Sequence, residues 1–280
     1  RLGDAAEAGS LRSRTLSELF VPLVWLFLLP NQSGGIDMNM ANEALACIRR
    51  MATHLQWGHY YYWLKRFLRQ LKEHAGKDET SASERLHVRG IVGVLEAFHF
   101  PMDEDVEMSD DPIADESSTQ APPHAIAHDL THDAADARSL PRAQRLALAT
   151  TLTTRVLPPL YEALATKDED RLPARLPLLI GTARLAMYLP SDRRNVELFK
   201  VFSELGSALR SKLQSTRDTC RDMGVQMLRA IGASYLPDVV HELRRILTRG
   251  PQLAVCAYTL HTLLVALAVP AVPGTTPLLT

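Results

Sequence analysis

The sequence predicts an all-α protein in which about five helix pairs stack into an α-α superhelix. Leu, Ala and Arg dominate the 280 residues and aromatic residues make up only 6%, a composition that favours helix over sheet. Outside one segment, apolar residues recur at steps of three and four, as in helices with one buried face. The expected helices fall into pairs spaced by roughly 35 to 45 residues, which is typical of HEAT-like repeats.

Residues 1–100 are predicted to hold the first HEAT-like helix pairs. The run from Val21 to Leu29 is about half as long as the ~20 residues a membrane span needs, and Pro22 and Pro30 interrupt or bound it. It therefore predicts a buried helix and not a membrane anchor. The apolar stripes of this part are Leu16, Leu19, Leu23 and Phe27; Ala41, Leu45, Ile48, Ala52 and Leu55; Trp57, Tyr60, Leu64, Phe67 and Leu71; and Leu86, Ile91, Leu95 and Phe98.

Residues 101–140 break this pattern and are predicted to form a disordered acidic linker. The segment holds eleven Asp and Glu against the single base Arg138, about −10, whereas the rest of the chain has thirty Lys and Arg against twenty-one acids, about +9. The near-neutral total of −1 thus hides a basic body. The segment is either a passive linker or a mimic of nucleic acid that shields a basic face until RNA arrives.

Residues 141–270 are predicted to hold the remaining helix pairs, and residues 271–280 a flexible tail. The apolar stripes here are Leu152, Val156, Leu160 and Leu164; Leu172, Leu176, Leu179, Ala183 and Met187; Val196, Phe199, Phe202, Leu205 and Leu209; Cys220, Met223, Met227 and Ile231; Val240, Leu243 and Leu247; and Leu253, Ala257, Leu260, Leu264 and Leu267.

Start and stop signals accompany the stripes. Gly250 followed by Pro251 pairs a helix-ending residue with one suited to a helix start, and Pro237 suits another first turn. Pro158 and Pro159 predict a kinked or split helix. Three sequence pairs fit a capping box, namely Thr15 with Glu18, Ser81 with Glu84, and Ser215 with Asp218.

The motifs of the common enzyme classes are absent from the sequence. It has no phosphate-binding glycine loop, no HExxH and no G-x-S-x-G, and its three widely spaced cysteines argue against a disulfide framework. His124, His128 and His132 would line one face of a helix and hold zinc or nickel if that helix existed, but they lie in the acidic segment, where a solvated polar tract is the competing interpretation. We expect no catalysis, no cofactor, no metal ion, no small-molecule substrate and no membrane.

Two groups of basic residues are candidates for contact with RNA or an acidic partner. Arg outnumbers Lys by twenty-five to six, and its planar guanidinium suits phosphate or carboxylate. A solvated charged face is the competing interpretation, and the nearby Tyr60–Trp63 cluster is either core packing or a base-stacking platform. The candidate contact residues are Lys65, Arg69 and Lys72, on one side of their helix, with Arg66 beside them, and Arg244, Arg245 and Arg249, near a helix end.

The amino-acid sequences of several segments resemble those of one family. The stretch from Thr216 to Leu264, with YLPDVVHELRRILTRG followed by YTLHTLL, is similar to the very large HEAT-repeat family called down-regulated in metastasis, the U-three small nucleolar RNA-associated protein twenty of the small-subunit processome. The block VPLVWLFLLP…ANEALACIRRMATHLQWGHYYYWLKRFL resembles another part of it. Pro251 and Ala254 depart from the aromatic and His expected there. The chain would then be an internal fragment of a longer protein.

The resemblance implies a non-catalytic, nucleolar scaffold that acts in pre-rRNA processing and small ribosomal subunit biogenesis. Its implied partners are pre-rRNA, small nucleolar ribonucleoprotein assembly factors and other processome proteins. The alternative is a nuclear transport receptor-like HEAT protein that binds other proteins. That alternative would predict acidic inner faces, whereas the body of this chain is basic.

Overall fold

The structure is a computed structural model that describes residues 11–29, 35–74, 81–100, 142–166 and 168–268. Every regular element in these ranges is helical, which confirms the all-α prediction. The predicted linker at 101–140 and tail at 271–280 lie outside the described residues. The division into domains therefore stays a prediction.

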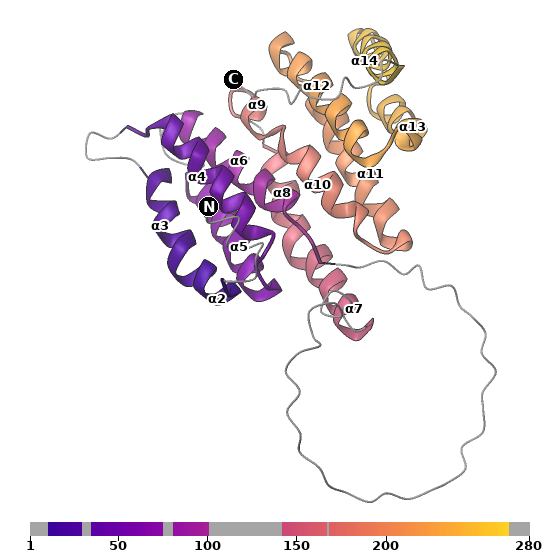
Figure 1. The fold of residues 1–280 in the computed structure, drawn as a ribbon. Helices are drawn as coiled ribbons and strands as arrows, with labels where there is room; N and C mark the ends of the chain where they lie inside the picture. The colour runs from indigo at the N-terminus through magenta and orange to yellow at the C-terminus, as the bar shows by residue number, and fades with distance from the viewer. Residues whose placement is uncertain (1–10, 30–34, 75–80, 101–141, 167, 269–280) are drawn as a thin grey trace, which may run out of the picture.

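Five helix pairs make up the stack, each with a helix in a first layer and a helix in a second layer (Figure 1). The first layer consists of η1 and α3 (Leu16–Phe20 and Val21–Trp25), α5 (Trp57–His74), the run α7, η3 and α8 (Arg142–Thr151, Leu152–Val156 and Leu157–Leu164), α11 (Ser191–Ala208) and α13 (Leu236–Ile246). The second layer consists of α4 (Met38–Ala52), α6 (Ser81–Glu96), α10 (Leu178–Met187), α12 (Gln214–Ile231) and α14 (Pro251–Ala268). The short elements are α2 (Ser13–Thr15), η2 (Leu26–Leu28), α9 (Leu172–Arg175) and η4 (Ala233–Tyr235).

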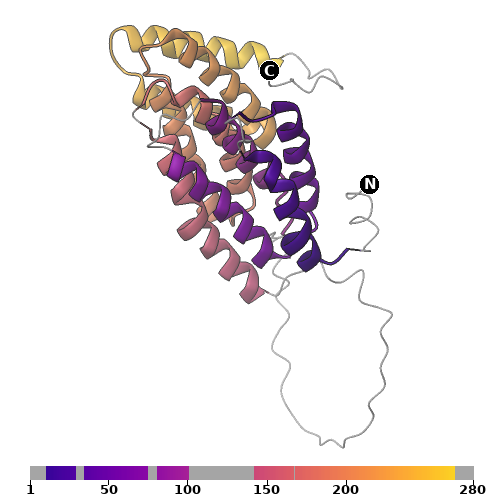
Figure 2. The same cartoon turned by 90° about the vertical axis from the view of Figure 1, so that its left-hand side faces the viewer.

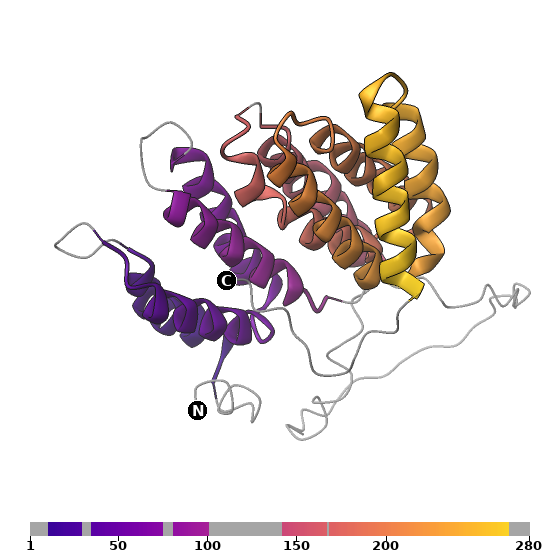
Figure 3. The same cartoon turned by 90° about the horizontal axis from the view of Figure 1, so that it is seen from above.

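The second layer forms a continuous row, in which α4 contacts α6, α6 contacts α10, α10 contacts α12, and α12 contacts α14. In the first layer α11 packs extensively on α13, whereas α8 contacts α5 on one side and α11 on the other more sparsely. Figure 2 views the stack from its α3 end, and Figure 3 shows the helices of successive pairs side by side, with α3 and α14 at opposite ends. Each inner pair thus buries apolar surface against both neighbours, as in repeat proteins.

Aromatic side chains of α5 hold the second pair together and join it to the first. The buried Tyr60 hydroxyl donates to the Val94 carbonyl of α6 at 2.6 Å within the second pair, and Trp63 Nε1 donates to Ser17 Oγ of η1 at 3.0 Å. The Trp25 ring packs on Trp63 and Phe67 with centroids 5.6 and 4.6 Å away. Core packing therefore accounts for most of the aromatic cluster, and only Tyr62 has a largely exposed ring.

Proline residues shape two first-layer helices in the same way. Pro158 and Pro159 open α8 directly after the π-helical turn η3, which separates α8 from α7. The turn η1 likewise precedes Pro22 near the start of α3. Proline has no N–H, and its ring clashes with the preceding turn of the helix. A wider, π-helical turn relieves this clash and lets the carbonyls that would have bonded to the proline N–H accept from other donors. The predicted split at Pro158 and Pro159 is confirmed.

The π-helical turn also explains why one predicted stripe is wrong. Leu19, Leu23 and Phe27 are about half exposed, whereas Val21 and Trp25 are buried. A π-helical turn holds more residues than an α-helical turn, so it rotates every later side chain relative to a 3.6-residue pattern. The run from Val21 to Leu29 is consequently buried on the side of Val21, Trp25 and Leu28 and not on the side that the sequence predicted.

Two further stripes are wrong in part, because their helices are apolar on more than one face. In α11, Phe202, Leu205 and Leu209 are buried as predicted. Val196 and Phe199 are exposed, and Leu198 and Val201 are buried in their place. In α14 the buried residues are Cys256, Thr259 and Leu263, whereas Leu253, Ala257 and Leu264 are exposed. Apolar spacing alone does not tell which of two apolar faces meets the neighbour. The other predicted stripes lie mainly in the core.

The predicted capping boxes do not match the helix starts. Thr15 lies within a continuous helical path and makes no capping bond, and α12 begins at Gln214, so Ser215 is already helical. Ser81 is the first residue of α6 and not the residue before it. The one side-chain cap comes from Asp37, which accepts from Asn39 N at 3.0 Å and Met40 N at 3.2 Å at the start of α4, among the described caps.

The predicted helix starts at Pro251 and Pro237 are confirmed, since α14 begins at Pro251. Gly250, with φ +52°, does not end α13, which stops at Ile246; it lies in the turn between α13 and α14. Pro237 lies in the first turn of α13.

Candidate interaction surfaces

Exposed cations follow one side of α5, as predicted. Lys65, Arg69 and Lys72 are all exposed. Lys72 Nζ lies 3.0 Å from Glu162 Oε1 of α8, and Arg69 Nε lies 3.7 Å from Glu73 Oε1 one turn further along α5. Carboxylates therefore offset part of the positive charge of this face.

Arg66 differs from the other three cations. Its guanidinium lies over the Trp25 ring at 4.8 Å and over the Trp63 ring at 5.0 Å. Such cation–π contacts hold a guanidinium in place while leaving its charge in water. Arg66 thus fastens α5 to α3 as well as adding charge.

The second predicted group lies at the end of α13. Arg244, Arg245 and Arg249 are exposed, and a shallow depression is lined by Pro237, Val240, His241, Arg244 and Arg245. Arg245 Nε donates to Glu242 Oε2 at 2.8 Å, and this hydrogen bond lowers the pKa of the Glu242 carboxyl. The structure does not bring the two groups together, because α5 belongs to the second pair and α13 to the fifth.

A groove of about 120 Å³ opens between α5 and α8, where the first layer packs sparsely. It is lined by Leu68, Leu71, Lys72, Pro159, Glu162, Ala163 and Arg175. The Lys72–Glu162 ion pair spans α5 and α8, and the buried Arg175 contributes to its wall.

Metal-binding chemistry has no candidate in the described residues, where no group of three or more His, Cys, Asp or Glu is placed to hold an ion. The row His124, His128 and His132 lies outside the described ranges. The three cysteines are free thiols, Cys47 half-buried and Cys220 and Cys256 buried.

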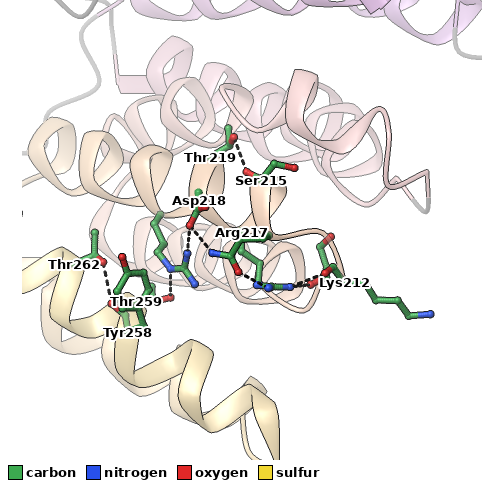
Figure 4. Close-up of polar contacts among 11 residues, drawn as sticks. Lys212, Ser215, Arg217, Asp218, Thr219, Tyr258, Thr259 and Thr262 are labelled. Atoms are coloured by element: carbon green, nitrogen blue, oxygen red, sulfur yellow. Dashed lines mark hydrogen bonds and ion pairs between the residues drawn. The ribbon is translucent and has the colours of Figure 1, made fainter.

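The interface between α12 and α14 contains a polar network around Arg221 that periodicity did not reveal. Figure 4 labels its partners Asp218, Tyr258 and Thr259. Arg221 is 4% exposed; its Nη1 lies 2.5 Å from Asp218 Oδ1, its Nε donates to Thr259 Oγ1 at 3.2 Å, and its guanidinium lies 4.5 Å from the Tyr258 ring centroid. Nearby, Arg217 Nη1 donates to the Ser211 carbonyl at 2.7 Å. These contacts fix α14 on α12 and orient Tyr258.

A second set of cations, missed by the sequence analysis, lies on the second layer. Arg49 Nη2 of α4 is 3.2 Å and Arg184 Nη1 of α10 is 3.0 Å from the Glu96 carboxylate of α6. Arg89 Nη1 of α6 donates to Asn42 Oδ1 of α4 at 3.1 Å. Arg85 and Arg89 are one turn apart in the sequence, but nothing in the sequence shows that α4 and α10 flank them.

Apolar side chains are exposed at both ends of the stack. At one end they belong to η1, α3 and η2, and at the other to α14. By length and composition alone, α14 is the one helix of the described ranges that could cross a membrane; its mean hydropathy is 1.4 and 17% of it is buried. One such helix is weak evidence, so the expectation of no membrane contact stays a prediction. The exposed residues are Leu19, Leu23, Leu26, Phe27 and Leu29 at the first end, and Leu253, Tyr258, Leu264 and Val265 at the second.

Comparison with known proteins identifies the relatives of this stack. Residues 165–277 match the U3 small nucleolar RNA-associated protein 20 domain. The U3 small nucleolar RNA-associated protein 20 of Schizosaccharomyces pombe is 27% identical over 268 residues, which cover 95% of this chain and 10% of that protein. The protein of the same name from Saccharomyces cerevisiae is 24% identical over 267 residues, 94% of this chain and 9% of that protein. The chain is a distant homologue of U3 small nucleolar RNA-associated protein 20.

The chain thus spans about a tenth of the length of these curated relatives. The U3 small nucleolar RNA-associated protein 20 domain begins before α9 and includes α10 to α14. It therefore contains the α13 basic group and the Arg221 network. The α5 face and the arginines of α4 and α6 lie outside the matched domain.

Proposed function

We propose that this chain is part of a non-catalytic scaffold of the small-subunit processome that acts in pre-rRNA processing and small ribosomal subunit biogenesis. The observation that carries the proposal is the homology to U3 small nucleolar RNA-associated protein 20 along 94–95% of the chain. The proposed partners are pre-rRNA, small nucleolar ribonucleoprotein assembly factors and other processome proteins, and the proposed location is the nucleolus.

The architecture supports a scaffold function, because a scaffold acts through its exposed surface. A stack of helix pairs offers long layer faces, and cations are exposed on both layers of this one, on α5 and α13 and on α4, α6 and α10. Arginine on such faces suits phosphate groups and acidic side chains. Buried ion pairs and aromatic contacts between pairs, such as those of Arg175 and Trp25, keep the faces rigid.

The test is crosslinking of the full-length protein in cells followed by sequencing of the attached RNA. Enrichment of pre-rRNA and of small nucleolar RNA supports the proposal. Recovery of cargo proteins without any enrichment of rRNA would favour the nuclear transport receptor-like alternative and overturn it. Depletion of the protein should also cause precursors of the small-subunit rRNA to accumulate, measured by northern blotting.

The contribution of the α5 face is tested separately, with Lys65, Arg69 and Lys72 changed to Glu in the full-length protein. We expect weaker crosslinking to pre-rRNA with normal protein levels. Arg66 is kept, because its contacts with Trp25 and Trp63 stabilise the fold. Changing Arg244 and Arg249 to Glu tests the α13 group in the same way, with Arg245 kept to hold Glu242.

A further inference from the structure

We propose that the outer face of α4, α6 and α10 is a binding surface for the phosphate backbone of RNA, centred on Arg85, Arg89, Arg49 and Arg184. The inference rests on the proposed function and names the partner class of one particular face. It concerns the second layer, whereas the sequence analysis placed its candidate contacts on α5 and α13.

The charge of this face is the first argument. Glu84 is buried against Arg175 of α9 on the other side of α6 and adds nothing to the outer face. The remaining charged residues of α4, α6 and α10 are five arginines and two glutamates, which gives a net charge of +3. They are Arg49, Arg50, Arg85, Arg89 and Arg184 with Glu43 and Glu96.

The position of Glu96 is the second argument. The side chain of Glu96 is 19% exposed, whereas those of Arg49 and Arg184, which both contact it, are 56% and 40% exposed. The carboxylate therefore lies beneath two guanidiniums, and the cations are what a partner meets. One carboxylate shared by two arginines leaves one positive charge unbalanced, while a hydrogen bond from Arg184 and an ion pair with Arg49 hold both side chains in place.

Preorganisation is the third argument. Arg89 is held by the neutral amide of Asn42, and a Cβ added to Gly93 would lie 3.7 Å from the Arg49 side chain, so Arg49 crosses α6 at this glycine. Side chains already fixed by the protein lose less conformational entropy when a partner binds. A row of fixed guanidiniums across three helices suits a polymer of regularly spaced phosphates, because arginine can donate two parallel hydrogen bonds to each.

The experiment measures binding of the 280-residue chain to a fluorescently labelled, mixed-sequence single-stranded RNA over a salt series. The test variant carries Arg85→Glu and Arg89→Glu. The matched control carries Arg210→Glu and Lys212→Glu, an equal charge change at two exposed residues beside the α11–α12 turn. Arg49 and Arg184 are kept because they cover Glu96. Circular dichroism and thermal unfolding confirm that each variant is folded.

We expect the test variant to lose at least about tenfold in affinity and the control less than about twofold. A neutral variant with Arg85→Gln and Arg89→Gln should reduce the slope of log K against log salt by about 1.4, since each phosphate contact to a single strand contributes about 0.7. Equal losses in test and control, or no RNA binding by the unmodified chain, would overturn the inference.

Competition with poly-glutamate identifies the class of partner. If poly-glutamate competes more weakly than unlabelled RNA of equal charge, the result supports a phosphate-binding face. If the two compete equally, the face binds acidic polymers in general, and the inference is overturned.

The result is separable from the proposed function. If the test variant binds RNA normally while the full-length protein still crosslinks to pre-rRNA, only this inference fails. If pre-rRNA is not crosslinked in cells, the proposed function fails whatever the affinity in vitro.

Discussion

The Arg175 guanidinium of α9 contacts the Glu84 carboxylate of α6 at 2.5 Å, with both side chains at most a tenth exposed. Arg175 Nη1 also donates to the Ala163 carbonyl of α8 at 3.1 Å. The buried cation thereby joins the second helix pair to the third. In the chain these two pairs are separated by residues 101–141, which lie outside the described ranges.

Removing one partner of this pair should be strongly destabilising, because the other charge would stay buried without compensation. We expect Glu84→Gln to lower the free energy of unfolding by about 3–5 kcal/mol, and Glu84→Leu with Arg175→Met together to recover most of the loss. Urea unfolding followed by circular dichroism measures both. The exposed Arg14–Glu18 pair is the matched control, since Glu18→Gln should cost less than about 0.5 kcal/mol. A similar cost at both sites would contradict this account.

Two helix glycines should respond to alanine in opposite ways. A Cβ at Gly90 would lie 2.8 Å from Cδ1 and 2.9 Å from Cζ of the buried Phe67 ring, so α5 and α6 would have to move apart. We expect Gly90→Ala to cost about 1–3 kcal/mol. At Gly224 the nearest atoms are 3.5 Å away, on Leu205 and Leu263, and alanine favours helix, so Gly224→Ala should be neutral or stabilising by up to about 1 kcal/mol. Thermal unfolding of the two variants decides between these signs.

The acid sensitivity of α13 should depend on Glu242. Hydrogen bonds from Arg245 lower the pKa of its carboxyl, so the ionised form stabilises the fold above the unfolded-state pKa of about 4.3. This contribution is lost as the pH falls through the lower, folded-state pKa. Glu242→Gln should therefore be less stable than the unmodified chain near pH 7, and the difference should shrink toward pH 3. Urea midpoints across this range measure it; a difference that does not change with pH would refute the assignment.

Glu204 of α11 should show the opposite sign, because burial raises the pKa of its carboxyl. A raised pKa in the folded protein means that stability falls as the pH rises from about 4.3 through the folded-state value. Glu204→Gln removes this penalty. The variant should gain stability over the unmodified chain near neutral pH and show no gain at pH 3, in the same urea series.

The thiols should react in an order set by burial. Burial raises the pKa of Cys220 to about 12, and its Sγ lies 3.4 Å from the Leu205 carbonyl, whereas Cys47 is only half-buried. Because the thiolate is the reactive form, iodoacetamide at pH 8 should label Cys47 first and Cys220 only as the protein unfolds. Mass spectrometry of timed samples gives the order, and Cys47→Ser should remove the fast phase. Rapid labelling of Cys220 in the folded chain would be incompatible with the buried position.

Local sequence patterns predicted the helices better than their orientation. The α5 stripe of Tyr60, Leu64, Phe67 and Leu71 is buried as expected, because α5 has a single apolar face. The spacing of Val196 and Phe199 is equally regular, yet both are exposed, since α11 also carries Leu198 and Val201 on the face that meets its neighbours. Which of two apolar faces is buried depends on the crossing of helices far apart in the sequence.

The candidate surfaces show the same division. The exposure of Lys65, Arg69 and Lys72 follows from their place opposite a buried stripe, and this was predictable. The grouping of Arg49 with Arg184 was not, because both depend on Glu96 of a third helix. Contacts between neighbouring helices of a layer are set by packing, which the spacing of residues along the sequence does not show.

Adjacent leucines of α14 provide a matched test of the exposed end of the stack. Leu263 is fully buried against α12, and Leu264 is 56% exposed on a helix that is apolar on nearly all sides. Burying a charge in the core is costly, so Leu263→Glu should unfold the C-terminal pairs, whereas Leu264→Glu with Leu253→Glu should leave the stability nearly unchanged.

The exposed face of α14 should also promote self-association, because large exposed apolar patches promote association. We expect the unmodified chain to self-associate in sedimentation velocity and the Leu253→Glu, Leu264→Glu double variant to remain monomeric. Flotation with lipid vesicles separates this from membrane binding. Recovery of the unmodified chain with the vesicles, and of the double variant in the soluble fraction, would show that the exposed face of α14 binds lipid and would contradict the expectation of no membrane contact.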